Sequence, residues 1–201
     1  MRIQRVYTEQ PLESGAEITL EEDSSHHLHH VLRMQAGDSV NIFNNGDEYA
    51  ATLGPIGKNG TTAVLRKLVF EEPEPTLEIH LLIGISRGER MDFALQKATE
   101  LGATCITPVF TKRCVVKLNE KKQASRMAHW RKIIINACEQ SGRCRLPQLD
   151  APLEVGSAVL THNSGTALLP GIRLGPRVMR TETAPLAAIA AIQALWGDFA
   201  D

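Results

Sequence analysis

The stretch Glu71-Glu72-Pro73-Glu74-Pro75 divides this chain of 201 residues into two parts with different sequence patterns. Its two prolines cannot donate the hydrogen bonds of a sheet and its three acidic residues resist burial, so a central strand cannot pass through it. Charged, proline-containing segments of this kind typically connect domains. The sequence therefore predicts a first domain over residues 1–72, a linker over residues 73–76 and a second domain over residues 77–201.

The part before the linker has the pattern of a small β domain. Its strand-like segments contain β-branched or aromatic residues and are separated by turn residues such as Asn44-Asn45-Gly46-Asp47. One helix, from about Glu21 to Arg33, interrupts them. The predicted strands are Ile3–Tyr7, Glu17–Leu20, Ser39–Phe43, Glu48–Leu53 and Thr61–Phe70. This arrangement is typical of a small β-barrel with one helix.

The part after the linker has the pattern of an α/β domain. The predicted strands are Leu77–Ile85, Thr104–Val109 and Ser157–Leu160, and the predicted helices are Glu89–Leu101, Glu120–Cys138 and Thr181–Gly197. Gly102 is expected to end the first of these helices. From Ala184 to Trp196 the last helix has a single polar residue, Gln193, so it is apolar nearly all round. Such a helix is buried on most sides, and we expect a subunit interface to bury it.

Charge is distributed unevenly along the chain. The formal net charge is −1, but residues 1–76 carry six Lys/Arg against twelve Asp/Glu, whereas residues 111–145 carry ten against two. The basic block suits a polyanionic partner, and a solvated helix face is the alternative explanation. Hydrophobic residues make up 43% of the chain, but none of its apolar runs is long enough for a membrane span. The first residues, Met1–Arg5, lack the apolar stretch of a secretory signal. We therefore expect a folded, cytoplasmic protein without a membrane segment.

Several common motifs are absent or incomplete. The chain has no Gly-x-Gly, which argues against dehydrogenases, P-loop NTPases and Rossmann-type methyltransferases. His26 and His30 are spaced to share a helix face, but they lack a third ligand. The four cysteines also lack the short paired spacing of a structural zinc site; they are Cys105, Cys114, Cys138 and Cys144. We therefore expect no metal ion.

Two arginine-bearing segments occupy positions where α/β proteins bind ligands. Ser86-Arg87-Gly88-Glu89-Arg90 follows a predicted strand and opens a helix. A capping loop with incidental arginines is an equally good explanation of that segment. Between Gly175-Pro176 and the apolar last helix lie three further charged residues, Arg177, Arg180 and Glu182. Polar groups packed against a buried helix are costly unless they bind something, so this second segment is the stronger candidate.

A series of stretches along nearly the whole chain resembles one known family. They are Met1–Ile3, His27-Leu28, Val31–Met34, Ser86–Met91, Gln96-Lys97, Glu100–Gly102, Ile106–Pro108, Arg113–Leu118, Trp130–Lys132, Ala137–Gln140, Gly142-Arg143 and Leu174–Ala184. Together, and in this order, they resemble the ribosomal RNA small subunit methyltransferase E family, which belongs to the SPOUT class.

The resemblance implies a fold and an activity. The expected fold is a small PUA-like β-barrel that helps to bind RNA, followed by an α/β SPOUT domain with a trefoil knot, in a homodimer. The expected reaction moves a methyl group from S-adenosyl-L-methionine to N3 of a uridine in 16S rRNA of the small ribosomal subunit. Two alternatives stay open: a non-catalytic RNA-binding protein with the same fold, and a methyltransferase for another rRNA or tRNA nucleotide.

The resemblance also assigns roles to residues. The implied catalytic residues are Arg177, Arg180 and Glu182. The implied cofactor-binding residues are Leu174, Gly175, Pro176, Val178, Met179 and Thr183. The implied RNA-binding residues are Arg2, Arg33, Arg87, Arg90, Arg113, Lys117, Arg131 and Arg143.

The chain departs from the family pattern in one place. The family carries a Gly-Pro-Glu-Gly-Gly loop that forms one wall of the cofactor pocket, upstream of the segment that begins at Leu174. Between the strand predicted at Ser157–Leu160 and Leu174 lie only about a dozen residues, too few for that loop together with a further strand and its crossover. Either the loop is deleted, which would cripple the enzyme, or residues between about Thr166 and Gly171 are missing from this sequence.

Overall fold

The structure is a computed structural model that describes residues 3–57, 60–111, 120–157, 178–180 and 182–200. The chain divides into two compact units. Unit 1 contains residues 1–74 and 138–145, and unit 2 contains residues 75–137 and 146–201. The first boundary falls within the proline-containing segment. Residues 138–145 belong to unit 1, although the sequence pattern placed all residues after the linker in the second domain.

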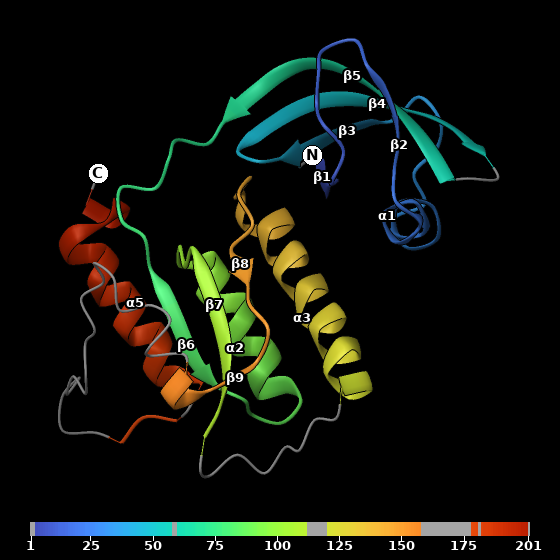
Figure 1. The fold of residues 1–201 in the computed structure, drawn as a ribbon. Coiled ribbons are helices and arrows are strands. Elements are labelled where there is room, and N and C mark those ends of the chain that lie inside the picture. The colour runs from blue at the N-terminus through green and yellow to red at the C-terminus, as the bar shows by residue number, and fades with distance from the viewer. Residues whose placement is uncertain (1–2, 58–59, 112–119, 158–177, 181, 201) are drawn as a thin grey trace. The chain divides into compact units, whose positions relative to one another are not determined.

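Unit 1 is built on a five-stranded mixed sheet in the order β1-β3-β4-β5-β2 (Figure 1). The strands are β1 Gln4–Tyr7, β2 Glu17–Thr19, β3 Ser39–Asn44, β4 Asp47–Gly57 and β5 Gly60–Glu71. The β1–β3 pair is parallel, and the pairs β3–β4, β4–β5 and β2–β5 are antiparallel. Apolar side chains from the strands and the helical segment fill one core, among them Val6, Ile18, Leu28, Val40 and Leu53.

The turn between β3 and β4 confirms the hairpin predicted there. Asn45 and Gly46 both have positive φ angles, 51° and 101°, as a type I′ turn requires. Along the β4–β5 pair the register shifts between Glu48 and Tyr49 and again between Ala50 and Ala51. Such bulges bend and twist strands, and Figure 1 shows both strands curved along their length. Curvature of this kind is how small barrels close.

The helix predicted over Glu21–Arg33 consists of two short pieces. They are α1, Glu22–His26, and the π-helix η1, His27–Val31. The His26 and His30 rings share a face as predicted, with their centroids 4.5 Å apart. The His29 ring, within the π turn, is held by the Met34 carbonyl and the Thr61 hydroxyl, each at 2.7 Å.

Unit 2 contains a parallel sheet in which β7 pairs with β6, β8 and β9. The strands are β6 His80–Gly84, β7 Cys105–Phe110, β8 Gln148–Leu149 and β9 Leu153–Glu154. Two helices follow the first two strands, α2 Glu89–Glu100 and α3 Glu120–Ser141. The last turn of α3, from Cys138, is assigned to unit 1. The core of unit 2 includes Ile83, Met91, Leu95, Ile106 and Trp130.

Some element boundaries differ from the predicted ones. The helix end at Gly102 is confirmed, since this residue has φ 92°. Strand β6 begins at His80 rather than Leu77, because the register places His80 opposite Cys105, the first residue of β7. The strand predicted from Ser157 is wrong at its start, since the chain is helical from Val155 to Ser157. Residues 158–160 lie outside the described residues.

The last helix, α5, spans Thr183–Trp196, and the short 3-10 helix η2 follows at Asp198–Ala200. Ile189 and Gln193 are buried in unit 2, whereas Leu195 and Trp196 are 68% and 67% exposed. One side of α5 therefore packs within the chain and another side stays open in a single copy, so burial at a subunit interface remains a prediction. Across the residues that the structure describes, no helix combines the length and apolarity of a membrane span.

Candidate active site and polar clusters

Three strands of unit 2 end at one edge of its sheet. The register pairs Gly84 with Val109 and Phe110 with Glu154, so the carboxyl ends of β6, β7 and β9 meet. Beyond β6, Gly88 has φ 51° and opens helix α2, with open space where a Cβ would stand. Ligands of open α/β sheets bind at such carboxyl edges, so this edge is the candidate active site.

Helix α5 begins at the same edge. Near its other end, the Gln193 amide donates to the Leu101 carbonyl at the C-terminus of α2, at 3.2 Å. Both helices therefore run in the same direction away from the carboxyl edge, as Figure 1 shows. The first turn of α5 is closed by bonds from the Thr183 and Ala184 amides to the Arg180 carbonyl, at 3.0 and 3.1 Å. The described residues that precede α5, 178–180 and 182, thus lie at the end where the strands finish.

The structure describes part of the predicted catalytic and cofactor-binding set. Val178 is fully exposed, Arg180 and Thr183 are exposed, and Met179 and Glu182 are half-buried. Accessible apolar and charged side chains are therefore adjacent along the chain at this edge. The remaining predicted residues of this set, Leu174, Gly175, Pro176 and Arg177, lie outside the described residues.

The predicted RNA-binding residues have different surroundings. Four of them are exposed, Arg33, Arg87, Arg90 and Arg131. Arg143 is half-buried, with its Nε 3.8 Å from a Glu72 oxygen, so its charge is already partly balanced. Exposed lysines that were not singled out from the sequence share α3 with Arg131: Lys121, Lys122 and Lys132. Arg2, Arg113 and Lys117 lie outside the described residues.

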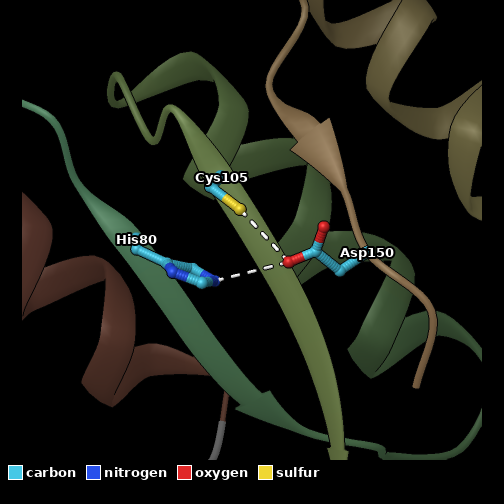
Figure 2. Close-up of side chains that lie close together, drawn as sticks. All are labelled: His80, Cys105 and Asp150. Atoms are coloured by element: carbon cyan, nitrogen blue, oxygen red, sulfur yellow. Dashed lines mark hydrogen bonds and ion pairs between the residues drawn. The ribbon is translucent and has the colours of Figure 1, made fainter. Parts of the chain in front are cut away.

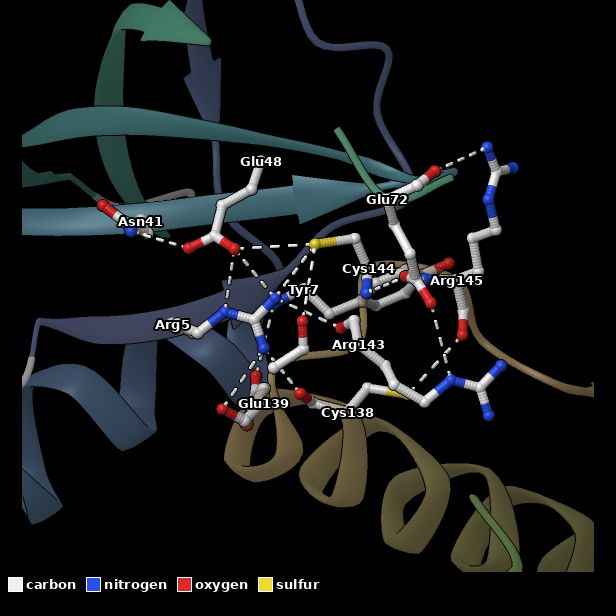
Figure 3. A network of polar contacts seen from close by, with 11 residues as sticks. Arg5, Tyr7, Asn41, Glu48, Glu72, Cys138, Glu139, Arg143, Cys144 and Arg145 are labelled. Atoms are coloured by element: carbon white, nitrogen blue, oxygen red, sulfur yellow. Dashed lines mark hydrogen bonds and ion pairs between the residues drawn. The ribbon is translucent and has the colours of Figure 1, made fainter. Parts of the chain in front are cut away.

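A buried cluster around Arg5 attaches the segment 138–145 to the sheet of unit 1 (Figure 3). The Arg5 guanidinium forms an ion pair with Glu48 at 3.0 Å, with both side chains 8% exposed. It also donates to the carbonyls of Cys138 and Arg143, at 2.6 and 3.2 Å, and lies 4.3 Å from the Phe43 ring centroid. Since the last carbonyls of a helix lack partners within the helix, Arg5 serves as a side-chain cap for α3.

Two further carboxylates complete this cluster. The Glu72 carboxylate accepts hydrogen bonds from the backbone amides of Cys144 and Arg145, the second at 2.7 Å. Glu139 accepts one from the Tyr7 amide at 3.2 Å. Burial raises the pKa of the Glu139 carboxyl to about 7, although the Tyr7 hydrogen bond and the charge of Arg5 act in the opposite direction. Glu139 is thus an acid that titrates near neutral pH inside unit 1.

A second cluster lies in unit 2, where side chains from three segments converge (Figure 2). The His80 Nε2 lies 2.7 Å from the Thr107 hydroxyl, which donates to an Asp150 oxygen at 2.6 Å. The Cys105 thiol donates to that same oxygen at 3.4 Å. His80 and Cys105 are register partners, and Thr107 is two residues further along β7, so these side chains share one face of the sheet.

The thiols that the structure describes are free, and all are held in the neutral form. Burial, joined by the charge of Asp150, raises the pKa of Cys105 to about 12. Burial likewise raises the pKa of both Cys138 and Cys144 to about 12. For Asp150, burial favours a higher pKa, but hydrogen bonds from Thr107, Gln148 and Cys105 and the charge of His80 together lower the pKa. These cysteines are therefore unsuited to act as nucleophiles.

Comparison with known proteins decides the family. Residues 72–170 match the family model of an RNA methyltransferase domain, and residues 20–66 match that of an RNA methyltransferase PUA domain. Ribosomal RNA small subunit methyltransferase E of Buchnera aphidicola from Schizaphis graminum is 30% identical, over 98% of this chain and 98% of that protein. The same protein of Buchnera aphidicola from Acyrthosiphon pisum is 29% identical, over 98% and 96%. The chain belongs to the ribosomal RNA small subunit methyltransferase E family.

Solved structures of this family agree with the fold. The ribosomal RNA small subunit methyltransferase E of Neisseria gonorrhoeae, crystallised with S-adenosyl methionine, superposes with a TM-score of 0.89. It is 33% identical, and the match covers 98% of this chain and 100% of that one. Both the PUA-like part and the α/β part of the present chain therefore have counterparts in one relative that binds S-adenosyl methionine.

The family comparison also bears on the short interval before Leu174. The alignments with the two Buchnera proteins extend over 242 and 241 residues, more than the 201 residues of this chain. Those relatives therefore carry residues that have no counterpart here. The interval itself, with the predicted loop position near residues 166–171, lies outside the described residues.

Proposed function

We propose that this chain is an S-adenosylmethionine-dependent methyltransferase that modifies N3 of a uridine in 16S rRNA, acting as a homodimer through a trefoil-knotted SPOUT domain. The observation that carries the proposal is the position of Arg180 and Glu182. They precede α5 at the carboxyl edge of the parallel sheet, in a chain whose relatives are named as rRNA methyltransferases. We propose residues 1–72 as the RNA-binding domain, residues 73–76 as the linker and residues 77–201 as the catalytic domain.

The residues at this edge fit the cofactor. A fully exposed Val178 and a half-buried Met179 offer apolar contacts for an adenosine group, next to the exposed Thr183. We infer that these three residues, with Leu174, Gly175 and Pro176, hold S-adenosylmethionine. When bound, it supplies a methyl group on a positively charged sulfur, which an incoming nitrogen displaces in line.

The chain's own task is to prepare the uridine. N3 carries a proton and lies on the Watson–Crick edge, so the base must leave its pairing partner and the proton must leave N3. Arg177 and Arg180 would stabilise the negative charge that then spreads onto the carbonyl oxygens of the base. Glu182 accepts the proton or orients an arginine. Transfer forms the N3–carbon bond and breaks the sulfur–carbon bond, so positioning does most of the work.

Basic side chains from both units would hold the RNA. Selected exposed arginines, one in unit 1 and three in unit 2, supply sequence-independent contacts to phosphates. They include Arg33, Arg87, Arg90 and Arg131, and we extend the same role to Arg2, Arg113, Lys117 and Arg143. The exposed lysines of α3 add to this basic surface.

One observation favours a second function, that of a non-catalytic RNA-binding protein. The relatives align over more residues than this chain possesses. If the absent residues include a wall of the cofactor pocket, RNA binding would survive without methyl transfer. Calorimetric titration with S-adenosylmethionine separates the two functions, since the enzyme must bind the cofactor and the binding protein need not.

The decisive experiment is methylation of small ribosomal subunits in vitro, with the modified nucleotide mapped by mass spectrometry. Arg177→Ala and Arg180→Ala should each abolish methylation while the dimer and the fold are retained. Arg66→Ala, which removes an exposed arginine on β5, is the matched control and should stay active. Wild-type turnover by Arg177→Ala would remove that residue from the active site, and methylation at another atom or nucleotide would replace the proposed substrate.

A further inference from the structure

We propose that His80, Cys105 and Asp150 form a binding site for a zinc ion. No metal site was expected from the sequence, because these three residues are far apart along the chain. The parallel sheet brings them together: His80 begins β6, Cys105 begins β7, and Asp150 directly follows β8. One ligand atom from each lies within 4.8 Å of the others. Figure 2 shows the three side chains pointing toward one another.

The spacing of the ligand atoms is close to that of a zinc site. Tetrahedral zinc with one sulfur, one nitrogen and one oxygen ligand separates those atoms by about 3.3–3.6 Å, given the usual metal–ligand distances. The Cys105 Sγ lies 3.4 Å from the Asp150 oxygen, and the His80 Nε2 lies 3.8 Å from it. The third separation, between the Cys105 Sγ and the His80 Nε2, is at most 4.8 Å, so side-chain rotations must bring these two atoms up to about 1.2 Å closer.

The surroundings orient the carboxylate. The Gln148 amide donates to the other oxygen of Asp150 at 2.7 Å, and the Thr107 hydroxyl donates to the oxygen that points into the cluster. Hydrogen bonds of this kind fix metal ligands and raise their affinity. Binding would break two existing contacts, because the His80 Nε2 must leave the Thr107 hydroxyl and the Cys105 thiol must give up its hydrogen bond to Asp150.

The donor set selects the kind of ion. A thiolate, an imidazole and a carboxylate suit zinc, whereas magnesium and calcium prefer oxygen ligands alone. The side chains of His80 and Asp150 are 17% and 19% exposed, so an ion can enter and water can serve as the fourth ligand. Burial raises the pKa of the Cys105 thiol to about 12 in the metal-free chain, but a zinc ion deprotonates a coordinating thiol outright. On binding, the S–H bond therefore breaks, its proton passes to solvent and the sulfur forms the bond to zinc.

The site is separate from the proposed active edge. His80 and Cys105 begin their strands, whereas the arginine-bearing segments lie at the end where the strands finish. The apolar core uses the other face of the same strands, through Ile83 and Ile106. A zinc ion here would tie the starts of β6 and β7 to the segment after β8, independently of cofactor binding.

Cobalt(II) titration of the full, untagged, reduced chain tests the proposal. Cobalt bound to a thiolate gives an intense near-ultraviolet charge-transfer band, and zinc should displace it. We expect one equivalent of cobalt to produce the band. Cys105→Ser should abolish it, and His80→Gln and Asp150→Asn should each weaken cobalt affinity roughly 100-fold or more, with magnesium unable to compete.

Two control variants make the result specific. His129→Gln removes the imidazole from a pair in which His129 lies 3.0 Å from Asp92, a site with two donors and no sulfur, so the band should be unchanged. Cys138→Ala removes a thiol from unit 1 and should also leave the band unchanged. Circular dichroism and melting curves recorded without metal establish that each variant folds. Absence of the band in the wild-type chain, or its persistence in Cys105→Ser, would overturn the proposal.

Discussion

Unit 1 and unit 2 each contain a cluster of polar side chains, around Arg5 and around Asp150. The two clusters differ in how far their polar groups are buried and paired. Arg5 and Glu48 are each 8% exposed, and the guanidinium donors are taken up by a carboxylate and backbone carbonyls. In the second cluster, a hydroxyl and a thiol converge on one Asp150 oxygen, and the cluster is in contact with solvent. The first arrangement is closed and stabilising, whereas the second leaves ligand atoms that another group can use.

The reason for this difference is the chemistry of the side chains. A guanidinium has five donors in a rigid fork, keeps its charge at any ordinary pH and has no acceptor. Once its donors are satisfied in a buried site, it holds several segments together and binds nothing more. Histidine, cysteine and aspartate can each exchange a proton or a hydrogen bond for a metal bond. Variants that remove one side chain from each kind of cluster test this difference.

Arg5→Ala should cause the largest loss. It leaves the buried Glu48 carboxylate without its partner and the carbonyl of Cys138 without its donor. Removing one member of a buried pair costs about 3–5 kcal/mol. Chemical unfolding followed by circular dichroism measures this loss, and Arg66→Ala, at an exposed arginine of the same unit, should cost less than about 0.5 kcal/mol.

A double variant sharpens the first test. If the loss comes from an uncompensated charge, Arg5→Leu combined with Glu48→Leu should be more stable than Arg5→Leu alone. Equal stability of the single and double variants would show that the loss does not come from an uncompensated Glu48 charge. The cluster would then be a consequence of the packing around it.

The sequence could not have revealed either cluster, and the reason is distance along the chain. Arg5 and Cys138 are separated by 133 positions, so no local pattern links them. The same holds for His80, Cys105 and Asp150, which meet because three parallel strands start at one edge. Local features were predictable: positive φ at Asn45 and Gly46 follows from turn chemistry, and the end of α2 follows from Gly102. The start of β6 depends on its partner strand, and the sequence pattern missed it.

Gly102→Ala tests a closed polar contact inside unit 2. Gln193 is 3% exposed, its amide donates to the Leu101 carbonyl, and a Cβ on Gly102 would overlap that amide. With the strain of φ 92°, we expect a loss of about 2–3 kcal/mol. Gly37→Ala has a matching φ of 96° with open space around it, so it should lose about 1 kcal/mol in thermal unfolding. Equal losses would mean that the Gln193 contact contributes nothing.

Glu139→Gln should change how stability depends on pH. The pKa of Glu139 rises from 4.5 to about 7 on folding, so between these values the folded chain holds a proton that the unfolded chain has lost. Stability therefore falls as the pH rises from about 4.5 to 7, by on the order of 1–3 kcal/mol. The amide keeps the acceptor for the Tyr7 N–H without a charge. The free energy of unfolding of the variant, measured by chemical denaturation, should equal that of the wild-type chain at pH 4.5 and exceed it at pH 8. A constant difference between the two chains across this pH range would contradict the prediction.

Thr107→Val should cause the smallest loss of stability, because the cluster around Asp150 is partly exposed to water. The hydroxyl of this buried residue donates to Asp150 and contacts His80, and valine has nearly the same shape. Because Asp150 keeps the Gln148 and Cys105 hydrogen bonds and is partly exposed to water, the loss in metal-free protein should be about 0.5–1.5 kcal/mol. Unfolding in the presence of a chelator measures it. A loss as large as that of Arg5→Ala would show that the Asp150 cluster is closed as well, with its side chains committed to the fold and its ligand atoms unavailable to zinc.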